Sequence, residues 1–233
     1  MKKRILAIVL ALAMLLPAFA VGSLAATPEE EATALLDQTR AVLNSGKYTL
    51  KARGTSPFNG KMTPIAYVSD GNRTMFEATM DWAGMLQEMS GDKVSSMLYG
   101  GIMQLFFGKK VRFITDQDQA MIVFVNRRTY IDVPETPDSL DISAMFSGPE
   151  MTGMTVSEPV IGGKKYLCAA LSGDNDVTTR YYYLNGALKR ITLTVDAEEI
   201  AFEIDLLSPT VDESYFSTKW MLKLSVLSGL LPF

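Results

Sequence analysis

The second half of the chain alternates apolar and polar residues with a period of two, and turn residues separate the alternating stretches. In the last stretch every second residue from Ile200 to Leu206 is apolar, whereas the residues between them are mainly acidic. Successive side chains of a strand point to opposite faces of a sheet, so this pattern predicts strands with one apolar and one solvated face. The stretches are 155–161, 164–171, 177–184, 188–195 and 199–206.

A helix and further strands are predicted before this meander. Thr27, Pro28 and Glu30 are typical of a helix start, with an N-cap, a proline at the first helical position and a glutamate three residues after the cap. Apolar residues at helical spacing then continue until Gly46, so we predict an amphipathic helix over residues 28–44. Strand patterns follow at 48–53, 65–68, 73–80, 111–115, 121–125 and 129–133.

Two apolar insertions, 81–108 and 137–153, interrupt the strand pattern. Their apolar residues recur mostly at intervals of three and four, and glycines divide the first insertion, which predicts short helices or turns. These elements favour a mainly β (α+β) fold: a curved antiparallel sheet whose concave face is covered by the N-terminal helix and by short lid helices. No linker divides residues 27–233, which we expect to form a single domain.

The first 26 residues have the pattern of a secretory signal peptide. Lys2, Lys3 and Arg4 precede the uninterrupted apolar run 5–16, and small residues follow. Cleavage is expected after Ala20, Ala25 or Ala26, which predicts an extracytoplasmic protein: secreted, periplasmic or at the cell surface. The alternative is an uncleaved N-terminal anchor, because residues 5–26 carry no charge.

The composition excludes several classes of function. The chain has no histidine and a single cysteine, Cys168, which excludes catalytic sites built on histidine, His-ligated metals and an intramolecular disulfide. The formal net charge of −4, which becomes −7 without Lys2, Lys3 and Arg4, disfavours binding of nucleic acid or of an anionic membrane through bulk charge. Carboxylates such as Glu199 and Glu203 follow the polar side of one strand, and no nucleophile has an evident base partner. We therefore expect no enzymatic activity, no metal and no cofactor.

Three groups of residues each allow two interpretations. Six methionines from Met75 to Met103 are adaptable enough to form a lid over acyl chains, but ordinary core packing is the simpler interpretation. Tyr181 and Tyr183 share one face of a strand and either pack in the sheet or line a cavity. Basic pairs are typical of solvated strand ends, or they form a rim that attracts anionic lipid headgroups. These pairs are Lys109–Lys110, Arg127–Arg128, Lys164–Lys165 and Lys189–Arg190.

The order of elements resembles the outer-membrane lipoprotein carrier (LolA-like) superfamily, which also includes LppX-like lipid carriers and periplasmic regulators of sigma-factor signalling. The resemblance rests on the signal peptide, the helix 28–44 that runs directly into strand 48–54, the hairpin 111–126 and the closing meander. It implies that residues 27–233 form an incomplete β-barrel, or half-barrel, lidded by helices around an apolar cavity. A family arginine near the end of an early strand helps to hold the lid shut, which makes Arg73 the candidate lid latch.

The function that the resemblance implies is that of an exported binding protein that shields a lipid, an acyl chain or a lipidated molecule. The alternative is a cell-envelope sensor or adaptor that uses the same fold to bind a protein partner. In either case the protein is expected to be peripheral to a membrane at most. The residues expected to line the cavity and the lid are Leu50, Phe76, Met80, Met85, Leu86, Met89, Met97, Leu98, Phe124, Met145, Tyr181 and Tyr183.

Overall fold

The computed structural model describes most of the chain after the predicted signal peptide. That peptide, and most of the predicted second insertion with its candidate Met145, lie outside the described residues. None of the helices in the described part is long and apolar enough to cross a membrane. The described ranges are 26–56, 60–116, 119–133, 153–173, 177–195 and 197–224.

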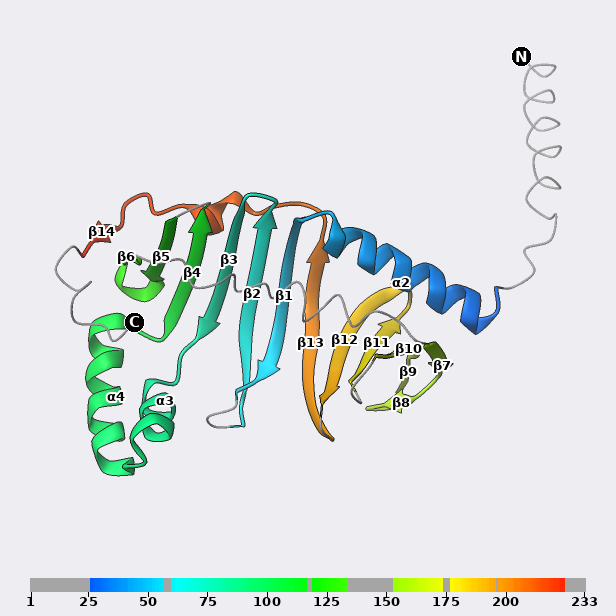
Figure 1. Ribbon diagram of the computed structural model, residues 1–233, viewed down its shortest axis with the longest axis horizontal. Coiled ribbons are helices and arrows are strands. Elements are labelled where there is room, and N and C mark those ends of the chain that lie inside the picture. The colour runs from blue at the N-terminus through cyan, green and yellow to red at the C-terminus, as the bar shows by residue number, and fades with distance from the viewer. Residues whose placement is uncertain are drawn as a thin grey trace, which may run out of the picture.

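Twelve strands of the described chain form one long, curved sheet that does not close into a barrel (Figure 1). Neighbouring strands are antiparallel apart from the parallel pair β14–β6, so the predicted mainly β fold with an open, curved sheet is confirmed. A separate two-stranded sheet pairs β8 (Val160–Ile161) with β9 (Lys164–Lys165). The order across the large sheet is β14 (Leu222–Lys223), β6 (Thr129–Val133), β5 (Gln119–Phe124), β4 (Lys110–Asp116), β3 (Arg73–Thr79), β2 (Met62–Asp70), β1 (Lys47–Thr55), β13 (Glu198–Ser208), β12 (Ala187–Val195), β11 (Thr178–Leu184), β10 (Leu167–Ser172) and β7 (Gly153–Ser157).

The sheet consists of two meanders that meet at its centre. Strands β1 to β6 follow one another in one direction, and strands β13 back to β10 follow one another in the other. The meanders are joined by the antiparallel pair β1–β13, in which Leu50 lies opposite Leu207. The continuity of the sheet therefore depends on a pairing between segments that are far apart in the sequence.

A β-bulge in β13 changes which of its residues face the core. Lys51 of β1 lies opposite Leu206, but the next residue, Ala52, lies opposite Ile204, so Asp205 is an extra residue. After the bulge it is Leu207 that packs against the core, whereas Leu206 is 42% exposed. The prediction that Leu206 shares the apolar face was therefore wrong. It assumed that the alternation of side chains continues past Asp205, where the bulge interrupts the pairing of β13 with β1.

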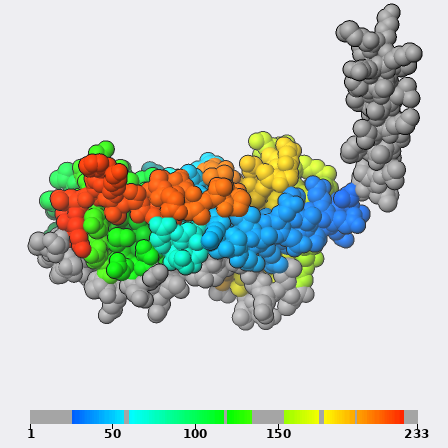
Figure 2. All heavy atoms as spheres, turned by 90° about the horizontal axis from the view of Figure 1, so that it is seen from above, coloured from blue at the N-terminus to red at the C-terminus, as the bar shows by residue number. Residues whose placement is uncertain are grey.

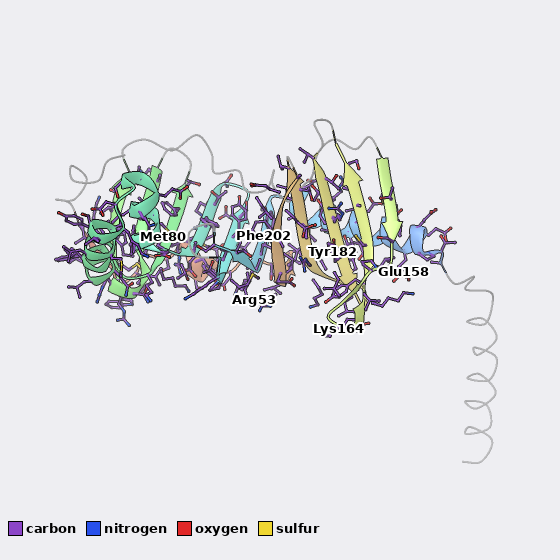
Figure 3. The ribbon with its side chains drawn as sticks, turned by 90° about the horizontal axis from the view of Figure 1, so that it is seen from below. Arg53, Met80, Glu158, Lys164, Tyr182 and Phe202 are labelled. Carbon is purple, nitrogen blue, oxygen red and sulfur yellow. The ribbon has the colours of Figure 1, made fainter. Side chains whose placement is uncertain are left out.

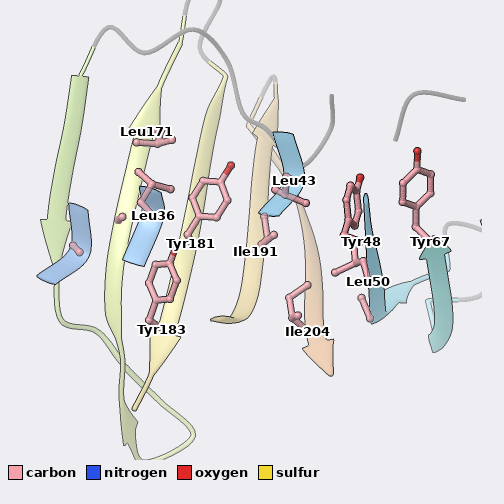
Figure 4. Packing of buried hydrophobic residues seen from close by; sticks show 13 residues of the cluster. Leu36, Leu43, Tyr48, Leu50, Tyr67, Leu171, Tyr181, Tyr183, Ile191 and Ile204 are labelled. Carbon is pink, nitrogen blue, oxygen red and sulfur yellow. The ribbon is translucent and has the colours of Figure 1, made fainter. Parts of the chain in front are cut away.

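The N-terminal helix α2 (Pro28–Asn44) has the predicted boundaries. The Thr27 hydroxyl accepts the backbone N–H of Glu30, and the Glu30 carboxylate accepts the backbone N–H of Thr27 at 2.8 Å, which completes the capping box. The helix lies over β1, β7 and β10. Its Leu36 and Leu43 are buried in a cluster that includes Tyr181 and other side chains of the sheet (Figure 4).

The first insertion folds into two short helices, as predicted, here called the lid helices: α3 (Trp82–Ser90) and α4 (Lys93–Phe107). Gly91 ends α3 in the left-handed region at φ +70°, where glycine is favoured. Asp92 then caps α4 by accepting the backbone N–H groups of Val94 and Ser95. The Ser95 hydroxyl and the Val94 N–H hold the pKa of Asp92 below its ordinary value. The turn between the helices is thus specified by local chemistry.

Helix α2 and the lid helices lie on the same face of the sheet, at opposite ends. Tyr67, Phe76 and Phe113 are direct neighbours across β2, β3 and β4, so their side chains share one face. Tyr67 belongs to the cluster beneath α2, whereas Phe113 packs with Trp82 at the start of α3. This inner face is therefore apolar along its length and is covered in two separate places.

Residues 209–224, here called the C-terminal strap, cover part of the opposite face (Figure 2, orange to red). Phe216 of the strap is buried against a cluster that contains Val68 and Met75. The strap includes the short 3-10 helix η2 (Glu213–Phe216) and ends at β14. The division into one apolar and one solvated face that was predicted for the closing meander does not extend to β2 to β5, because apolar side chains point to both faces there.

A buried ion pair fixes the strap to this opposite face. Glu77 of β3 and Arg112 of β4 are direct neighbours, and the Arg112 guanidinium donates to the Glu77 carboxylate at 2.7 and 3.0 Å. Arg112 also donates to the backbone carbonyl of Tyr215 in the strap at 2.8 Å, and Lys110 reaches the same carboxylate at 2.6 Å. Each charge is hydrogen-bonded, which offsets the cost of burying it.

Replacing Glu77 with alanine should lower the free energy of unfolding by about 3 kcal/mol, because the buried Arg112 would lose its carboxylate partner. The matched control is Glu158→Ala, since Glu158 pairs with Lys165 at 2.8 Å on the exposed surface. We expect the control to change stability by less than about 1 kcal/mol. Urea unfolding followed by circular dichroism measures both, and equal losses would contradict the role of the buried pair.

Candidate functional site

An apolar cavity lies between the lid helices and strands β4 and β5, at one end of the inner face. Its volume is about 660 Å³. Figure 3 shows Met80, one of its lining residues, beside the lid helices. Every lining residue is apolar or aromatic, and the set is Met80, Trp82, Met85, Leu86, Met89, Tyr99, Ile102, Met103, Phe107, Val111, Phe113, Ile122 and Phe124.

The base of the lid is fastened to the sheet beside the cavity. The indole N–H of Trp82, at the start of α3, donates to the carbonyl of Gly108, just after α4, at 2.6 Å. The ring of Phe107 lies 4.5 Å from that of Phe124 on β5 and 6.1 Å from that of Trp82, measured between centroids. These contacts hold the beginning and the end of the lid together and leave the cavity beneath the rest of it.

The lid helices approach each other closely because residue 100 has no side chain. A Cβ atom on Gly100 would lie 2.6 Å from the backbone nitrogen and the Cα atom of Ala83, a distance that the structure cannot accommodate without moving one helix. Gly101, the next residue, faces open space. The close crossing at Gly100 fixes the position of α3 relative to α4 and hence the shape of the cavity roof.

The chemistry of the cavity is that of a binding site for an apolar ligand. Tyr99 is its one lining residue with a titratable side chain, and the described residues contain no group of three or more His, Cys, Asp or Glu residues that could hold a metal. Hydrophobic burial is therefore the main interaction that this site offers to a ligand.

Five of the residues predicted from the sequence line this cavity. They come from the residue after β3, from α3 and from β5, so the structure brings together segments that the sequence separates. They are Met80, Met85, Leu86, Met89 and Phe124.

The other described candidates lie elsewhere. Met97 and Leu98 are 63% and 64% exposed on the side of α4 that faces away from the cavity. They were chosen for residue type, and helical spacing does not say which side of a helix faces the sheet. Leu50 is buried beneath α2, and Phe76 is half-buried against the same cluster, one strand away from the cavity.

Tyr181 and Tyr183 also pack beneath α2 (Figure 4). Their strand, β11, is separated from β4 by five other strands of the sheet, namely β3, β2, β1, β13 and β12. Their side chains share the inner face, as predicted, and the Tyr183 hydroxyl lies 3.0 Å from the Thr39 hydroxyl of α2. Burial raises the pKa of Tyr181 to about 12 and also raises the pKa of Tyr183. Both residues belong to the packed core between α2 and the sheet.

Eight lining residues were missed by the sequence analysis. The strand residues could have been predicted. Residues two apart in a strand share a face, so the choice of Phe124 in β5 also indicates Ile122. The residues from the lid had no such signal, since their orientation depends on how α3 and α4 cross. The missed residues are Trp82, Tyr99, Ile102, Met103, Phe107, Val111, Phe113 and Ile122.

Arg73, the candidate lid latch, holds the strap instead. Its guanidinium donates to the Asp70 carboxylate at 2.6 Å and to the Glu213 carboxylate of η2 at 2.8 Å, and it lies 4.3 Å from the centre of the Phe216 ring. The hydrogen bonds to Asp70 and Glu213 raise the pKa of Arg73. The contacts of Arg73 are therefore with the opposite face of the sheet, away from the lid helices.

A larger hollow, of about 920 Å³, lies between the start of α2 and β7. It is open to solvent, and acidic or hydroxyl side chains such as Glu29, Thr33 and Asp37 form much of its lining. A ligand on such a polar, solvated surface would exchange hydrogen bonds with water for similar ones with the protein and would bury little apolar area. The cavity beneath the lid helices is therefore the candidate site.

Comparison with solved structures adds distant likenesses, of which two follow. No family model and no curated protein matches the chain. The chain is similar to an uncharacterized conserved protein from Thermus thermophilus, with a TM-score of 0.41 and 6% identity over 83% of this chain and 98% of that chain. It is also similar to the MucA/MucB complex of Pseudomonas aeruginosa, with a TM-score of 0.39 and 11% identity over 84% of this chain and 64% of that chain. Such distant likeness carries no conclusion about function, and the resemblance to the LolA-like superfamily stays a prediction.

Two adjacent glycines test how the lid helices pack. Gly100→Ala should destabilise the protein by at least about 1 kcal/mol, because the new methyl group collides with Ala83. Gly101→Ala should instead be neutral or stabilise the protein by up to about 1 kcal/mol, because alanine favours a helix and nothing lies near its Cβ position. Thermal and urea unfolding report both effects, and a harmless Gly100→Ala would show that the helices do not cross in this way.

Proposed function

We propose that this chain is an exported, non-enzymatic binding protein that shields an acyl chain, or a similar apolar group of a lipid, in the cavity beneath the lid helices. The observation that carries the proposal is the lining: thirteen apolar or aromatic side chains surround a space of about 660 Å³. Ligand pockets in proteins typically have volumes of about 300–1,000 Å³. An acyl chain has the matching chemistry, because it makes no hydrogen bonds that the lining would leave unsatisfied.

The methionines in the lining support a ligand of variable shape. Met80, Met85, Met89 and Met103 contribute unbranched, flexible side chains to the wall. Such side chains adapt to irregular apolar surfaces more easily than branched ones. The wall from β4 and β5 is formed by Val111, Phe113, Ile122 and Phe124, so an adaptable roof faces a stiffer floor.

The setting outside the cytoplasm is part of the proposal and rests on the signal peptide pattern of residues 1–26. An acyl chain that leaves a membrane must be protected from water during transfer. A cavity of this kind on an exported protein would provide that protection. The alternative function, a sensor or adaptor for a protein partner, would need no space for an acyl chain and predicts no uptake of one.

The Met85→Asp variant tests the proposal, because a carboxylate in the lining would face the acyl chain without a partner. We expect its affinity for a fluorescent long-chain fatty acid to fall at least about tenfold, since an unpaired charge in an apolar site costs several kcal/mol. Met97→Asp is the matched control, because Met97 is on a lid helix but outside the cavity, and it should bind as the wild type does. Fluorescence titration, with displacement by unlabelled phospholipid, measures all three proteins.

Met85→Leu keeps the apolar volume and should bind nearly as well as the wild type, which separates the effect of charge from the effect of substitution. Far-ultraviolet circular dichroism checks that each variant is folded. If the wild type takes up no fatty acid, the carrier function is wrong and the adaptor function is favoured. Equal losses in Met85→Asp and Met97→Asp would place the ligand somewhere other than this cavity.

A further inference from the structure

The outer side of α4 carries a row of large apolar side chains that the described residues leave exposed. Val94 is 77% exposed, Leu105 67% and Phe106 66%, in addition to Met97 and Leu98. These five residues, here called the outer face of α4, occur at helical spacing along most of the helix. The inner side of the same helix is apolar too, since it forms part of the cavity wall. Helix α4 therefore has apolar side chains toward both the protein and the solvent.

Basic residues flank this helix, although the whole chain has a net charge of −4. No Asp or Glu occurs between Lys93, its first residue, and Thr115. Beyond its end lie Lys109 and, in or beside the 3-10 helix η1 (Val125–Arg127), Arg127 and Arg128. Arg127 donates to the carbonyl of α4 residue Gln104 at 3.4 Å, which places η1 beside the helix.

These four basic side chains can meet a charged surface without breaking a salt bridge. Lys93, Lys109, Arg127 and Arg128 are all exposed, and none forms a salt bridge with another residue in the described part of the chain. The acidic residues of the lid, Asp81, Glu88 and Asp92, precede the helix, and two of them are used as N-caps. The region around α4 therefore complements a surface that is negatively charged and apolar beneath.

Part of the cavity lining is itself exposed on the lid helices. Tyr99 and Ile102 of α4 line the cavity and are also 58% and 42% exposed. Met89, at the end of α3, lines the cavity and is largely exposed as well. Tyr99 and Ile102 lie on the same helix as the outer face of α4, and Met89 lies on the neighbouring lid helix, so exposed apolar residues occur both at the cavity and on the outer face.

We propose that α4 docks on a membrane that contains anionic phospholipid, with its outer face among the acyl chains and its flanking basic side chains at the headgroups. Amphipathic helices with basic residues bind lipid surfaces in this manner. The docking itself follows from the surface of α4. The exchange of an acyl chain between membrane and cavity, which docking would allow, rests in addition on the proposed function.

The geometry favours a lipid surface over a second copy of the chain or a protein groove. Helix α4 lies at one end of the elongated molecule, beside α3 (Figure 1), where its outer side can meet a planar surface. In a symmetric dimer built on the outer face, an antiparallel α4 pair would bring Lys93 toward Lys109 of the second copy, and like charges would repel. An anionic membrane instead pairs with both ends of the helix at once.

Vesicle binding by the processed chain, without the predicted signal peptide, tests the proposal. The protein should co-sediment with vesicles of phosphatidylcholine and phosphatidylglycerol, and at least about tenfold more weakly with phosphatidylcholine alone, because the basic residues contribute only at an anionic surface. Added salt should weaken binding to the anionic vesicles. Absence of binding to both compositions would overturn the proposal.

A pair of variants separates docking from cargo binding. Leu98→Glu combined with Leu105→Glu places two charges on the outer face and should reduce vesicle binding at least about tenfold, while binding of a soluble fluorescent fatty acid stays unchanged. The retained fatty acid binding also shows that this variant is folded. Met85→Asp should behave in the opposite way, with normal vesicle binding and weak fatty acid binding.

Two further outcomes would overturn the docking proposal. One is vesicle binding that survives in the Leu98→Glu, Leu105→Glu variant, because the contact would then be elsewhere. The other is a dimer of the wild type, seen by analytical ultracentrifugation and dissociated by the same variant, in a protein that does not bind vesicles. That result would assign the outer face to a second copy of the chain. Fatty acid uptake without vesicle binding would leave the proposed function standing while docking fails.

Discussion

The main constraint on this structure is that an apolar sheet face must be covered, and here the face is much wider than one helix. A 17-residue helix such as α2 is about 25 Å long, whereas twelve strands span roughly 50 Å. Helix α2 covers one end of the inner face, where Leu36 and Leu43 close the core. The other end is left to the lid helices, whose crossing at Gly100 and attachment at Trp82 hold them over the sheet without filling the space below.

The opposite face explains why the sheet can serve as a fixed wall for that space. The strap crosses β2 to β5 behind the cavity. Arg73 binds it through the Glu213 carboxylate, and Arg112, which is paired with Glu77, binds it through the Tyr215 carbonyl. Strands β4 and β5 are therefore packed on both faces, by the lid on one and by the strap on the other. The lid is joined to this wall mainly at its base, so we expect ligand exchange to involve the lid helices more than the strands.

Local signals predicted the elements well. The capping box at Thr27 and Glu30 and the turn residues of the meander are short-range chemistry, and the sequence contains all of it. The bulge at Asp205 escaped prediction because it appears only when β1 and β13 are aligned, and it reversed the orientation of Leu206. The role of Arg73 escaped for a similar reason, since its partner Glu213 is 140 residues away in the sequence.

The cavity could be predicted as a kind of site but not in its details. The abundance of methionine indicated an adaptable apolar lining, and Met85 and Met89 are indeed part of it. Residue type does not reveal helix orientation, so Met97 and Leu98 were placed in the cavity although they lie on its outside. The orientation of α4 is set by a contact between Gly100 and Ala83, in which the important feature is a missing side chain.

Native mass spectrometry of the protein purified from the cells that produce it tests the central claim most directly. If the cavity shields an acyl chain, a fraction of the wild-type protein should have the mass of the processed chain plus one lipid. The lipid should be absent from Met85→Asp and present in Met85→Leu. A wild-type protein found only at the mass of its own chain, or a lipid that Met85→Asp retains, would contradict the assignment of this cavity as the binding site.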